Sequence, residues 1–430
     1  MNYFSLNNPA NTASFSQAVI KGIAPDRGLY FPEKIPTLPA EFFDQIDSLD
    51  VHSLAVKVMA PYLGDEIPQA VLQTIVEKTL DFEFPVVPLT DSIGCLELFH
   101  GPTLAFKDVG ARFMAQCLGY FNAKNKQKVT VLVATSGDTG GAVANGFLGV
   151  EGIEVVILYP KGKVSEVQEK QLTTLGQNIT ALEVDGVFDD CQDMVKTAFL
   201  DTTITDKVQL TSANSINVAR WLPQMLYYFL AYRQLKHKDQ PLVVSVPSGN
   251  FGNICAGMIA KQMGLPIHHF IASTNINDTV PRYLKTKKYA PRPTSPTLSN
   301  AMDVSDPSNF VRIQTIYGNR FDTLSQSLSG YRFTDAQTQE AMKALHAATG
   351  YIADPHGAVG YLGLKRYLEH SPKAYGLFLE TAHPVKFLDT VEETLKRKVH
   401  LPQRIESLLA KEKKSISISS YSDLSDFLLR

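Results

Sequence analysis

Apolar segments that alternate with helix-like segments constrain this chain more than any other feature of its sequence. Val129–Ala134 and Leu242–Pro247 are almost entirely apolar, and the segments 154–159, 268–273 and 375–381 have the same character. Strands of this kind are buried on both faces, which is typical of parallel sheets covered by helices. The sequence therefore predicts an α/β protein with two open, mostly parallel sheets that face each other across a cleft.

The length of the chain predicts more than one domain. Its 430 residues exceed what one modest core can bury. The pattern predicts an N-terminal domain over residues 1–85, one α/β domain over 86–240, a second over 241–400, and a C-terminal helix and tail over 401–430. The N-terminal domain carries no catalytic cluster and is expected to pack against the main body. A long helix is expected from Ser212 to Leu235, after a polar turn.

The charge and cysteine content exclude several classes of partner. Lys and Arg number 41 against 43 Asp and Glu, so a net charge of −2 gives no general attraction to nucleic acid or to a membrane surface. No segment approaches the ~20 apolar residues that span a bilayer, and the first residues do not resemble a secretory signal. The four cysteines lack metal-ligand spacing and are expected to be buried thiols. We expect a cytoplasmic protein without a metal site.

Lys107 stands at the start of a predicted buried helix. Apolar residues at helical spacing accompany it, namely Phe106, Val109, Phe113 and Cys117. Most lysines lie on the surface, but here desolvation and the positive end of the helix both disfavour the ammonium and lower its pKa. A neutral amine can form an imine with an aldehyde and can later move protons as a base and an acid.

A glycine-rich loop between a strand and a helix predicts an anion site. It follows Ser248 and consists of Gly249, Asn250, Phe251, Gly252 and Asn253. Free N–H groups at a helix start bind phosphate, although a plain tight turn is the alternative. The loop is neither a GxGxxG fingerprint nor a P-loop, which argues against dinucleotides and nucleoside triphosphates. Together with Lys107, it predicts a cofactor with an aldehyde and a phosphate, namely pyridoxal 5'-phosphate.

A second group of polar residues is suited to an anionic substrate. Arg220 lies among apolar residues, and a buried arginine needs an anion. With Asn214 and Ser215 nearby, it could grip a phosphate through two N–H groups. Helix capping by Ser212 or Asn214 is an equally good interpretation of the polar turn. The turn 135–141 also follows a strand and could hold a carboxylate.

Three further residues are ambiguous on their own. Thr381 ends an apolar strand, and a structural threonine is its simplest interpretation. His100 and His383 could act as general bases, but hydrogen-bonded structural histidines are the more common case.

Taken together, these segments resemble the threonine synthase family of fold-type II pyridoxal-phosphate enzymes. The likeness covers nearly the whole chain. The segments that carry it are 28–32, 64–68, 96–108, 135–141, 213–217, 248–253, 299–304 and 381–384. The resemblance implies the tryptophan synthase beta-like fold with an additional N-terminal domain, and a monomer or homodimer.

The resemblance also implies roles for individual residues. Lys107 would hold the cofactor as a Schiff base, Gly249 to Asn253 would bind its phosphate, and Thr381 would lie at its ring nitrogen. Asp138 occupies the place where many relatives carry asparagine beside the ring. The residues implied for the substrate phosphate are Asn214, Ser215 and Arg220, with Ser136 and Thr139 nearby. The implied reaction converts O-phospho-L-homoserine and water into L-threonine and phosphate.

Other functions are less well supported by the sequence. A serine/threonine dehydratase would act on free hydroxyamino acids and would not need Arg220 with Asn214 and Ser215. A non-catalytic relative would not need an intact Lys107 and a complete phosphate loop. A dinucleotide oxidoreductase is remote, because no GxGxxG segment follows a strand.

Overall fold

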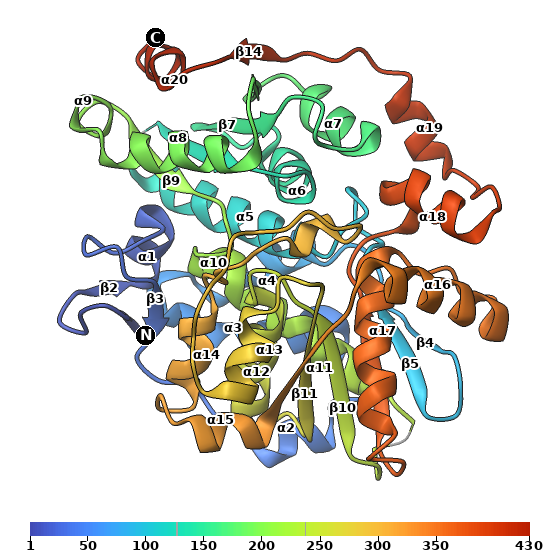
Figure 1. Ribbon diagram of the computed structural model, residues 1–430. Helices are drawn as coiled ribbons and strands as arrows, with labels where there is room; N and C mark the ends of the chain where they lie inside the picture. Colours follow the sequence, from blue (N-terminus) through green and yellow to red (C-terminus); the bar gives the residue numbers. More distant parts are fainter. Residues whose placement is uncertain (126–127, 237) are drawn as a thin grey trace.

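The computed structural model describes residues 1–125, 128–236 and 238–430. Figure 1 shows two α/β layers stacked above one another, with a small N-terminal unit against their side. The described strands form a six-stranded, a five-stranded and a three-stranded sheet. The predicted α/β class with two open, mostly parallel sheets is confirmed.

The six-stranded sheet is parallel except at one edge. Its strands, in order across the sheet, are β12 (Leu328–Arg332), β11 (His269–Thr274), β10 (Leu242–Pro247), β13 (Tyr375–Glu380), β5 (Ile93–Glu97) and β4 (Val86–Pro88). Only β4 runs antiparallel to its neighbour. Every residue of β10, β11 and β13 is buried, as expected for strands covered on both faces. Because β4 and β5 join this sheet, the limits predicted at 86 and 241 do not coincide with the division between the sheets.

The five-stranded sheet is parallel throughout. Its strands are, in order, β14 (Ile416–Ile418), β8 (Ile179–Val184), β7 (Ile153–Pro160), β6 (Val129–Ala134) and β9 (Gln209–Ser212). The edge strand β14 comes from the serine-rich C-terminal segment, which crosses the top of the molecule in Figure 1. The segment predicted as a helix and tail over 401–430 thus completes this sheet.

The N-terminal unit packs against both halves of the main body. Its sheet has the order β2 (Thr12–Ser14), β1 (Asn2–Ser5) and β3 (Tyr30–Pro32). Its helices are α1 (Phe15–Lys21), α2 (Ala40–Asp44), α3 (Val51–Leu63), the 3-10 turn η1 (Gly64–Glu66) and α4 (Gln69–Thr79). Helix α1 contacts both β9 and α5 (Lys107–Asn125), and the ring of Phe15 meets Phe121 on α5 edge to face. The unit shares its hydrophobic core with the main body.

The remaining helices cover the two large sheets. Those of the five-stranded half are α6 (Asp138–Phe147), α7 (Glu166–Thr173), α8 (Phe188–Leu200), α9 (Thr202–Thr205), α19 (Gln403–Leu409) and α20 (Tyr421–Leu428). Those of the other half are α12 (Gly252–Gln262), α13 (Thr279–Thr286), η3 (Asn300–Met302), α14 (Phe310–Ile316), α15 (Phe321–Ser327), α16 (Asp335–Thr349), α17 (Pro355–Leu368), η4 (Pro384–Phe387) and α18 (Leu388–Leu395). Helix α17 packs on β10, β11 and β13, whereas α8 packs on β6 and β7.

The single helix predicted from Ser212 to Leu235 is wrong. Ser212 ends β9, and the chain then forms α10 (Val218–Trp221), the 3-10 turn η2 (Leu222–Met225) and α11 (Leu226–Gln234). Asn217 caps α10 by accepting the N–H of Ala219, so the helix begins later than its apolar pattern suggests. Pro223 lacks an N–H group and fits only near the start of a helical segment, which explains the 3-10 turn.

Two remaining expectations concern the cysteines and membrane-spanning segments. The four cysteines are buried and free, as predicted. Among the described residues, no helix combines the length and apolar character needed to cross a bilayer.

Candidate active site

One pocket collects polar residues from the ends of both large sheets. Its volume is about 100 Å³. Its walls include Phe106, Lys107, Asp138, Thr139, Asn214, Ser215, Arg220, Gln224, Ser248, Gly249, Asn250, Phe251, Gly252, Asn253, Ala301, Met302, His356, Thr381 and Ala382. Four of its segments directly follow the carboxyl ends of β6, β9, β10 and β13, where open α/β sheets bind ligands.

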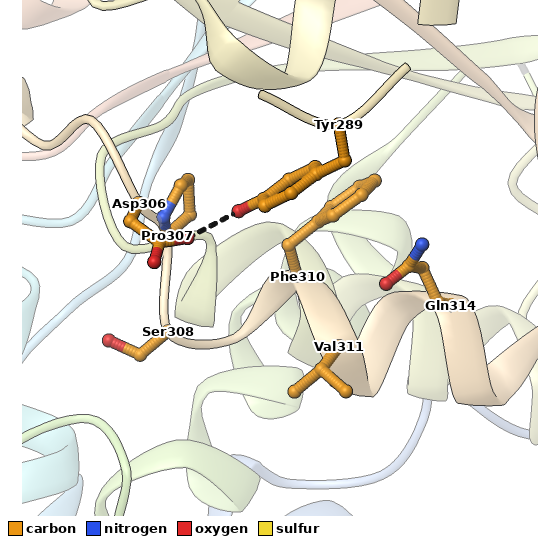
Figure 2. Close-up of a pocket in the computed structure, with 7 residues that line it drawn as sticks. All are labelled: Tyr289, Asp306, Pro307, Ser308, Phe310, Val311 and Gln314. Atoms are coloured by element: carbon orange, nitrogen blue, oxygen red, sulfur yellow. Dashed lines mark hydrogen bonds between the residues drawn. The ribbon is translucent and has the colours of Figure 1, made fainter. Parts of the chain in front are cut away.

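A second pocket is larger but lacks the chemistry of an active site. It has a volume of about 390 Å³ and is lined by Tyr289, Asp306, Pro307, Ser308, Phe310, Val311 and Gln314 (Figure 2). Its carboxylate, Asp306, accepts a hydrogen bond from the Tyr289 hydroxyl at 2.7 Å. The pocket contains neither a lysine nor an arginine, so the pocket around Lys107 is the candidate site.

Lys107 is the first residue of α5 and lies against the end of β13. Phe106 donates its N–H to the carbonyl of Thr381 at 2.9 Å, and Ala105 forms an isolated bridge with Ala382. Burial lowers the pKa of Lys107; the carboxylate of Asp138 opposes this shift, while the charges of nearby cations add to it. The expected direction of the shift is therefore present, which favours a reactive neutral amine.

The glycine-rich loop is shaped by close contact with a neighbouring segment. A Cβ on Gly249 would lie 2.8 Å from the carbonyl oxygen of Ala301, so only glycine fits there. Phe251 adopts a left-handed conformation with φ of 60° immediately before α12. In the part of the chain that the structure describes, the N–H groups of residues 249–253 have no protein acceptor. The loop therefore presents several free donors at a helix start, as an anion site requires.

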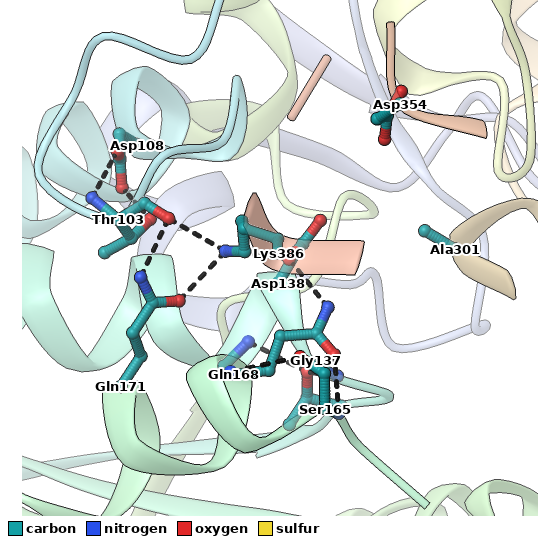
Figure 3. A network of polar contacts seen from close by, with 12 residues as sticks. Thr103, Asp108, Gly137, Asp138, Ser165, Gln168, Gln171, Ala301, Asp354 and Lys386 are labelled. Carbon is teal, nitrogen blue, oxygen red and sulfur yellow. Dashed lines mark hydrogen bonds and ion pairs between the residues drawn. The ribbon is translucent and has the colours of Figure 1, made fainter. Parts of the chain in front are cut away.

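Asp138 is held by a network of polar side chains (Figure 3). Its Oδ1 lies 2.8 Å from the Nζ of Lys386 and accepts the Nε2–H of Gln168 at 2.9 Å. Burial raises the pKa of Asp138, but the charges of Lys386 and Lys107 and the hydrogen bonds outweigh it, and the pKa falls below its usual value. Asp138 is therefore an ionised carboxylate on the pocket wall.

Arg220 is a buried cation with an incomplete set of partners. It is 3 % exposed, and its guanidinium donates to the carbonyl of Ala213. Its Nε–H has no partner in the described part of the chain. Burial lowers its pKa to about 10, so it stays charged at neutral pH. Asn214 and Ser215 line the pocket next to it. This group of donors is suited to an anion.

The histidines have structural contacts. His383 accepts the N–H of Val385 at its Nδ1, and burial followed by the charge of Arg404 lowers its pKa to about 4. His100 lies 2.7 Å from the carboxylate of Glu97. The structural interpretation of both is consistent with these contacts. His356, which the sequence analysis did not select, lines the pocket and accepts the N–H of Ala301.

The arrangement has the requirements of one class of enzyme. A buried lysine with a lowered pKa shares a pocket with a glycine-rich loop whose N–H groups have no acceptor in the described part of the chain. These features are those of a pyridoxal-phosphate-dependent enzyme, whose cofactor requires an amine for its aldehyde and N–H donors for its phosphate.

Comparison with known proteins identifies the family. A model described as a pyridoxal-phosphate-dependent enzyme matches residues 94–376. Models of the threonine synthase N terminus and C-terminal region match residues 2–80 and 357–427. The chain therefore belongs to the threonine synthase family and is a pyridoxal-phosphate-dependent lyase.

Individual relatives agree along the whole chain. The threonine synthase of Escherichia coli is 46% identical over 407 residues, with 94% of each chain covered. Its crystal structure superimposes with a TM-score of 0.94 and covers 100% of this chain and 99% of that one. A threonine synthase from Brucella melitensis, solved with pyridoxal phosphate bound, is 34% identical with a TM-score of 0.95, covering 100% of this chain and 98% of that one.

The structure brings together nearly all the residues selected from the sequence. All the residues selected for the cofactor or the substrate except Ser136 line the one pocket, whereas His100 and His383 do not; Ser136 lies half-buried in the adjoining turn. The sequence analysis missed Lys386, although it lies just beyond the motif that ends at Pro384. It also missed His356, whose local signal was the helix-start sequence Asp354-Pro355.

Proposed function

We propose that this protein converts O-phospho-L-homoserine and water into L-threonine and phosphate. The observation that carries the proposal is the presence of two separate anion sites in one pocket with Lys107. The free N–H groups of residues 249–253 are suited to the phosphate of the cofactor. The unpaired Nε–H of Arg220 is suited to a second phosphate, which an amino acid without one would leave unsatisfied.

The residues of the pocket fit pyridoxal phosphate. Lys107 is the amine for its aldehyde, and the loop 249–253 binds its phosphate. Asn253 adds a side-chain Nδ2 that is buried without a partner. Thr381 and Asp138 also line the pocket and would supply a hydroxyl and a carboxylate to the cofactor ring.

The substrate phosphate is bound by a different element. Arg220 on α10 and the preceding residues Asn214 and Ser215 provide its donors. Thr139, at the start of α6, contributes a hydroxyl from the opposite sheet end, with Ser136 in the same turn. Arginine can bind a phosphate dianion through two parallel N–H groups, so this group sets the choice of substrate.

The chain's own residues then perform acid–base chemistry and charge stabilisation. Pyridoxal phosphate, once bound, supplies an electron sink for the pair left at a substrate carbon. Lys107, released when the substrate amine replaces it, moves protons at Cα and Cβ. Arg220 stabilises the negative charge of the phosphate as its bond to Cγ breaks. Protons are then added at Cγ and Cα and the hydroxyl of water at Cβ, which gives L-threonine, and the remaining proton leaves with the phosphate.

The alternative functions are less consistent with this pocket. A serine/threonine dehydratase has no use for the donors of Arg220, Asn214 and Ser215. A non-catalytic relative has no use for an amine whose pKa is lowered. We further infer a cytoplasmic monomer or homodimer, with no nucleic-acid or membrane partner, in keeping with the near-neutral charge.

The test combines spectroscopy with product analysis. The purified protein, loaded with pyridoxal phosphate, is expected to release inorganic phosphate and L-threonine from O-phospho-L-homoserine in equal amounts. L-Serine and L-threonine, offered separately, are expected to give little 2-oxo acid. Lys107→Ala is expected to lose both the visible absorbance of the bound cofactor and turnover. A Lys107→Ala protein that keeps both, or a wild type that forms oxo acid faster than phosphate, contradicts the proposal.

A further inference from the structure

Lys386 is a second buried lysine next to the pocket, and the proposed reaction gives it no role. Its side chain has no exposed surface. It belongs to η4, the 3-10 turn after β13, whereas Lys107 begins α5. Taking an ammonium out of water is costly unless charges and hydrogen bonds compensate it, so its surroundings indicate its purpose.

The ammonium of Lys386 has three acceptors. It donates to the carbonyl of Thr103 at 2.8 Å and to the Oε1 of Gln171 at 2.9 Å, and it lies 2.8 Å from Asp138 Oδ1 (Figure 3). Three acceptors match the three N–H groups of an ammonium. Of the three acceptors, only Asp138 is charged, so the ion pair with Asp138 carries the electrostatic compensation.

The same contacts determine how Asp138 is oriented. Lys386 and Gln168 both bind Oδ1, and the amide of Gln168 is itself fixed because its Oε1 accepts the N–H of Ser165 at 3.1 Å. In the described part of the chain, Oδ2 of Asp138 receives no hydrogen bond from protein. Asp138 lines the pocket with Lys107, so one carboxylate oxygen is occupied by protein and the other is available to a bound group.

We infer that Lys386 is a positioning residue: it keeps Asp138 ionised and directs its free oxygen toward the cofactor. The inference rests on the pocket proposed above as the pyridoxal phosphate site.

The other charged groups around the pair do not replace Lys386. Lys107 also lies near Asp138. Its amine must be neutral to react, and it would be covalently bound to the cofactor, so it cannot serve as a lasting ammonium counterion. Asp108 lies near Lys386 and hydrogen-bonds to Thr103, which gives it partners of its own. Arg220 lowers the pKa of Lys107 and donates to the carbonyl of Ala213, and it forms no ion pair with Asp138 in the described part of the chain. Lys386 is therefore the permanent counterion of Asp138.

The test is a pH titration of the visible absorbance of the cofactor-loaded protein. Burial raises the pKa of Asp138, and the charge and hydrogen bond of Lys386 lower it, so loss of Lys386 is expected to raise the pKa of Asp138. Lys386→Met is therefore expected to show an additional absorbance transition at mildly acidic to neutral pH that the wild type lacks. In the double variant Lys386→Met/Asp138→Asn, that transition is expected to disappear, because neither charge is left.

The matched control is Lys398→Met, which breaks an exposed lysine–carboxylate pair with Glu392. It is expected to leave the titration unchanged. If Lys386→Met shows no new transition, or if the transition persists in the double variant, the inference is wrong. A wild type that binds no pyridoxal phosphate would instead overturn the proposed function, so the two failures are distinguishable.

Two further proteins keep the test decisive if Lys386→Met does not fold. Lys386→Gln removes the charge but keeps a donor for Thr103, and it is expected to show the same new transition. The double variant is expected to fold where Lys386→Met does not, because it removes both charges together. If the double variant also fails to fold, the loss of folding is due to the packing of the Lys386 side chain and not to its charge, and the inference is wrong.

Discussion

Two buried arginines, Arg220 and Arg312, both donate hydrogen bonds to the loop 213–216, but they differ in whether all their N–H groups have partners. Arg312 donates to the carbonyls of Tyr30, Ser215 and Ile216, and its guanidinium lies 4.2 Å from the ring centre of Trp221. In the described part of the chain, all its nitrogens have partners.

Arg220 is as deeply buried but has fewer partners. It donates to the carbonyl of Ala213 and leaves its Nε without an acceptor. Neither arginine forms an ion pair with a carboxylate in the described residues. The number of unpaired N–H groups therefore distinguishes two kinds of buried cation. The N–H groups of Arg312 are paired and hold the loop in place, whereas the unpaired Nε–H of Arg220 at the pocket wall is suited to an anion.

The largest expected effect is a loss of catalytic activity when Arg220 is replaced. Arg220→Ala should lose about 3–5 kcal/mol of transition-state binding, the scale for removing one partner of a buried charge pair. At about 1.4 kcal/mol per decade, kcat/KM for O-phospho-L-homoserine should fall at least a hundredfold. Steady-state phosphate release measures this, with exposed Arg292→Ala as the control. A loss of less than threefold would show that Arg220 does not bind the substrate phosphate.

The next largest effect is a loss of folding stability when Arg312 is replaced. Arg312→Met should lower the free energy of unfolding by about 2–4 kcal/mol, because several buried carbonyls lose their donors. Arg220→Ala should lower it less, since the Arg220 side chain has fewer hydrogen bonds to lose. Denaturant unfolding of the two variants in parallel measures the difference. Equal losses would remove the distinction between a structural and a ligand-binding arginine.

A smaller effect concerns the product phosphate. In the cofactor-loaded protein the loop 249–253 is occupied, so added phosphate should bind at Arg220. At ten times its Kd it should stabilise the wild type by about 1.4 kcal/mol. Arg220→Ala should show no such gain, and Arg312→Lys, which keeps a charge at the loop, should keep part of it. Unfolding midpoints with phosphate, and with chloride at equal ionic strength, provide the comparison.

The smallest effect is on the titration of Lys107. Burial lowers its pKa, and Arg220 adds to the shift. Cofactor uptake needs the neutral amine, so its rate should rise as pH rises through this pKa and then level off, at a lower pH than for an exposed lysine. Arg220→Ala should move the midpoint to higher pH, whereas Arg312→Met should not. Stopped-flow absorbance of the cofactor-free protein at several pH values tests this; a midpoint unchanged by Arg220→Ala contradicts it.

Much of the site could be predicted because its residues stand next to recognisable strands and helices in the sequence. Lys107 precedes an apolar helical stripe, and the loop 249–253 stands between an apolar strand and a helix, so each segment shows its own structure and chemistry. The single helix expected from Ser212 to Leu235 was wrong because Asn217 caps a helix that begins after it and Pro223 interrupts the helical hydrogen bonds, whereas the apolar pattern continues through both.

Other parts could not be predicted because they depend on contacts between distant segments. Lys386 stands between the apolar Val385 and Phe387, but its partners Thr103, Asp138 and Gln171 come from three other segments. Arg312 likewise reaches Tyr30 in the N-terminal unit. No spacing rule connects such residues.

The sequence by itself determined the parallel α/β class and the strands at the centre of both large sheets, and it selected Lys107 and the loop 249–253 as candidates. These features follow from short-range pattern and from the conformational needs of glycine and helix ends. Only the tertiary structure decided which cations are satisfied. It joined β4 and β5 to the sheet of β10, paired Lys386 with Asp138, and left the Nε of Arg220 free. The physical reason is that the energy of a buried charge depends on what surrounds it in space, and the chain order does not record those surroundings.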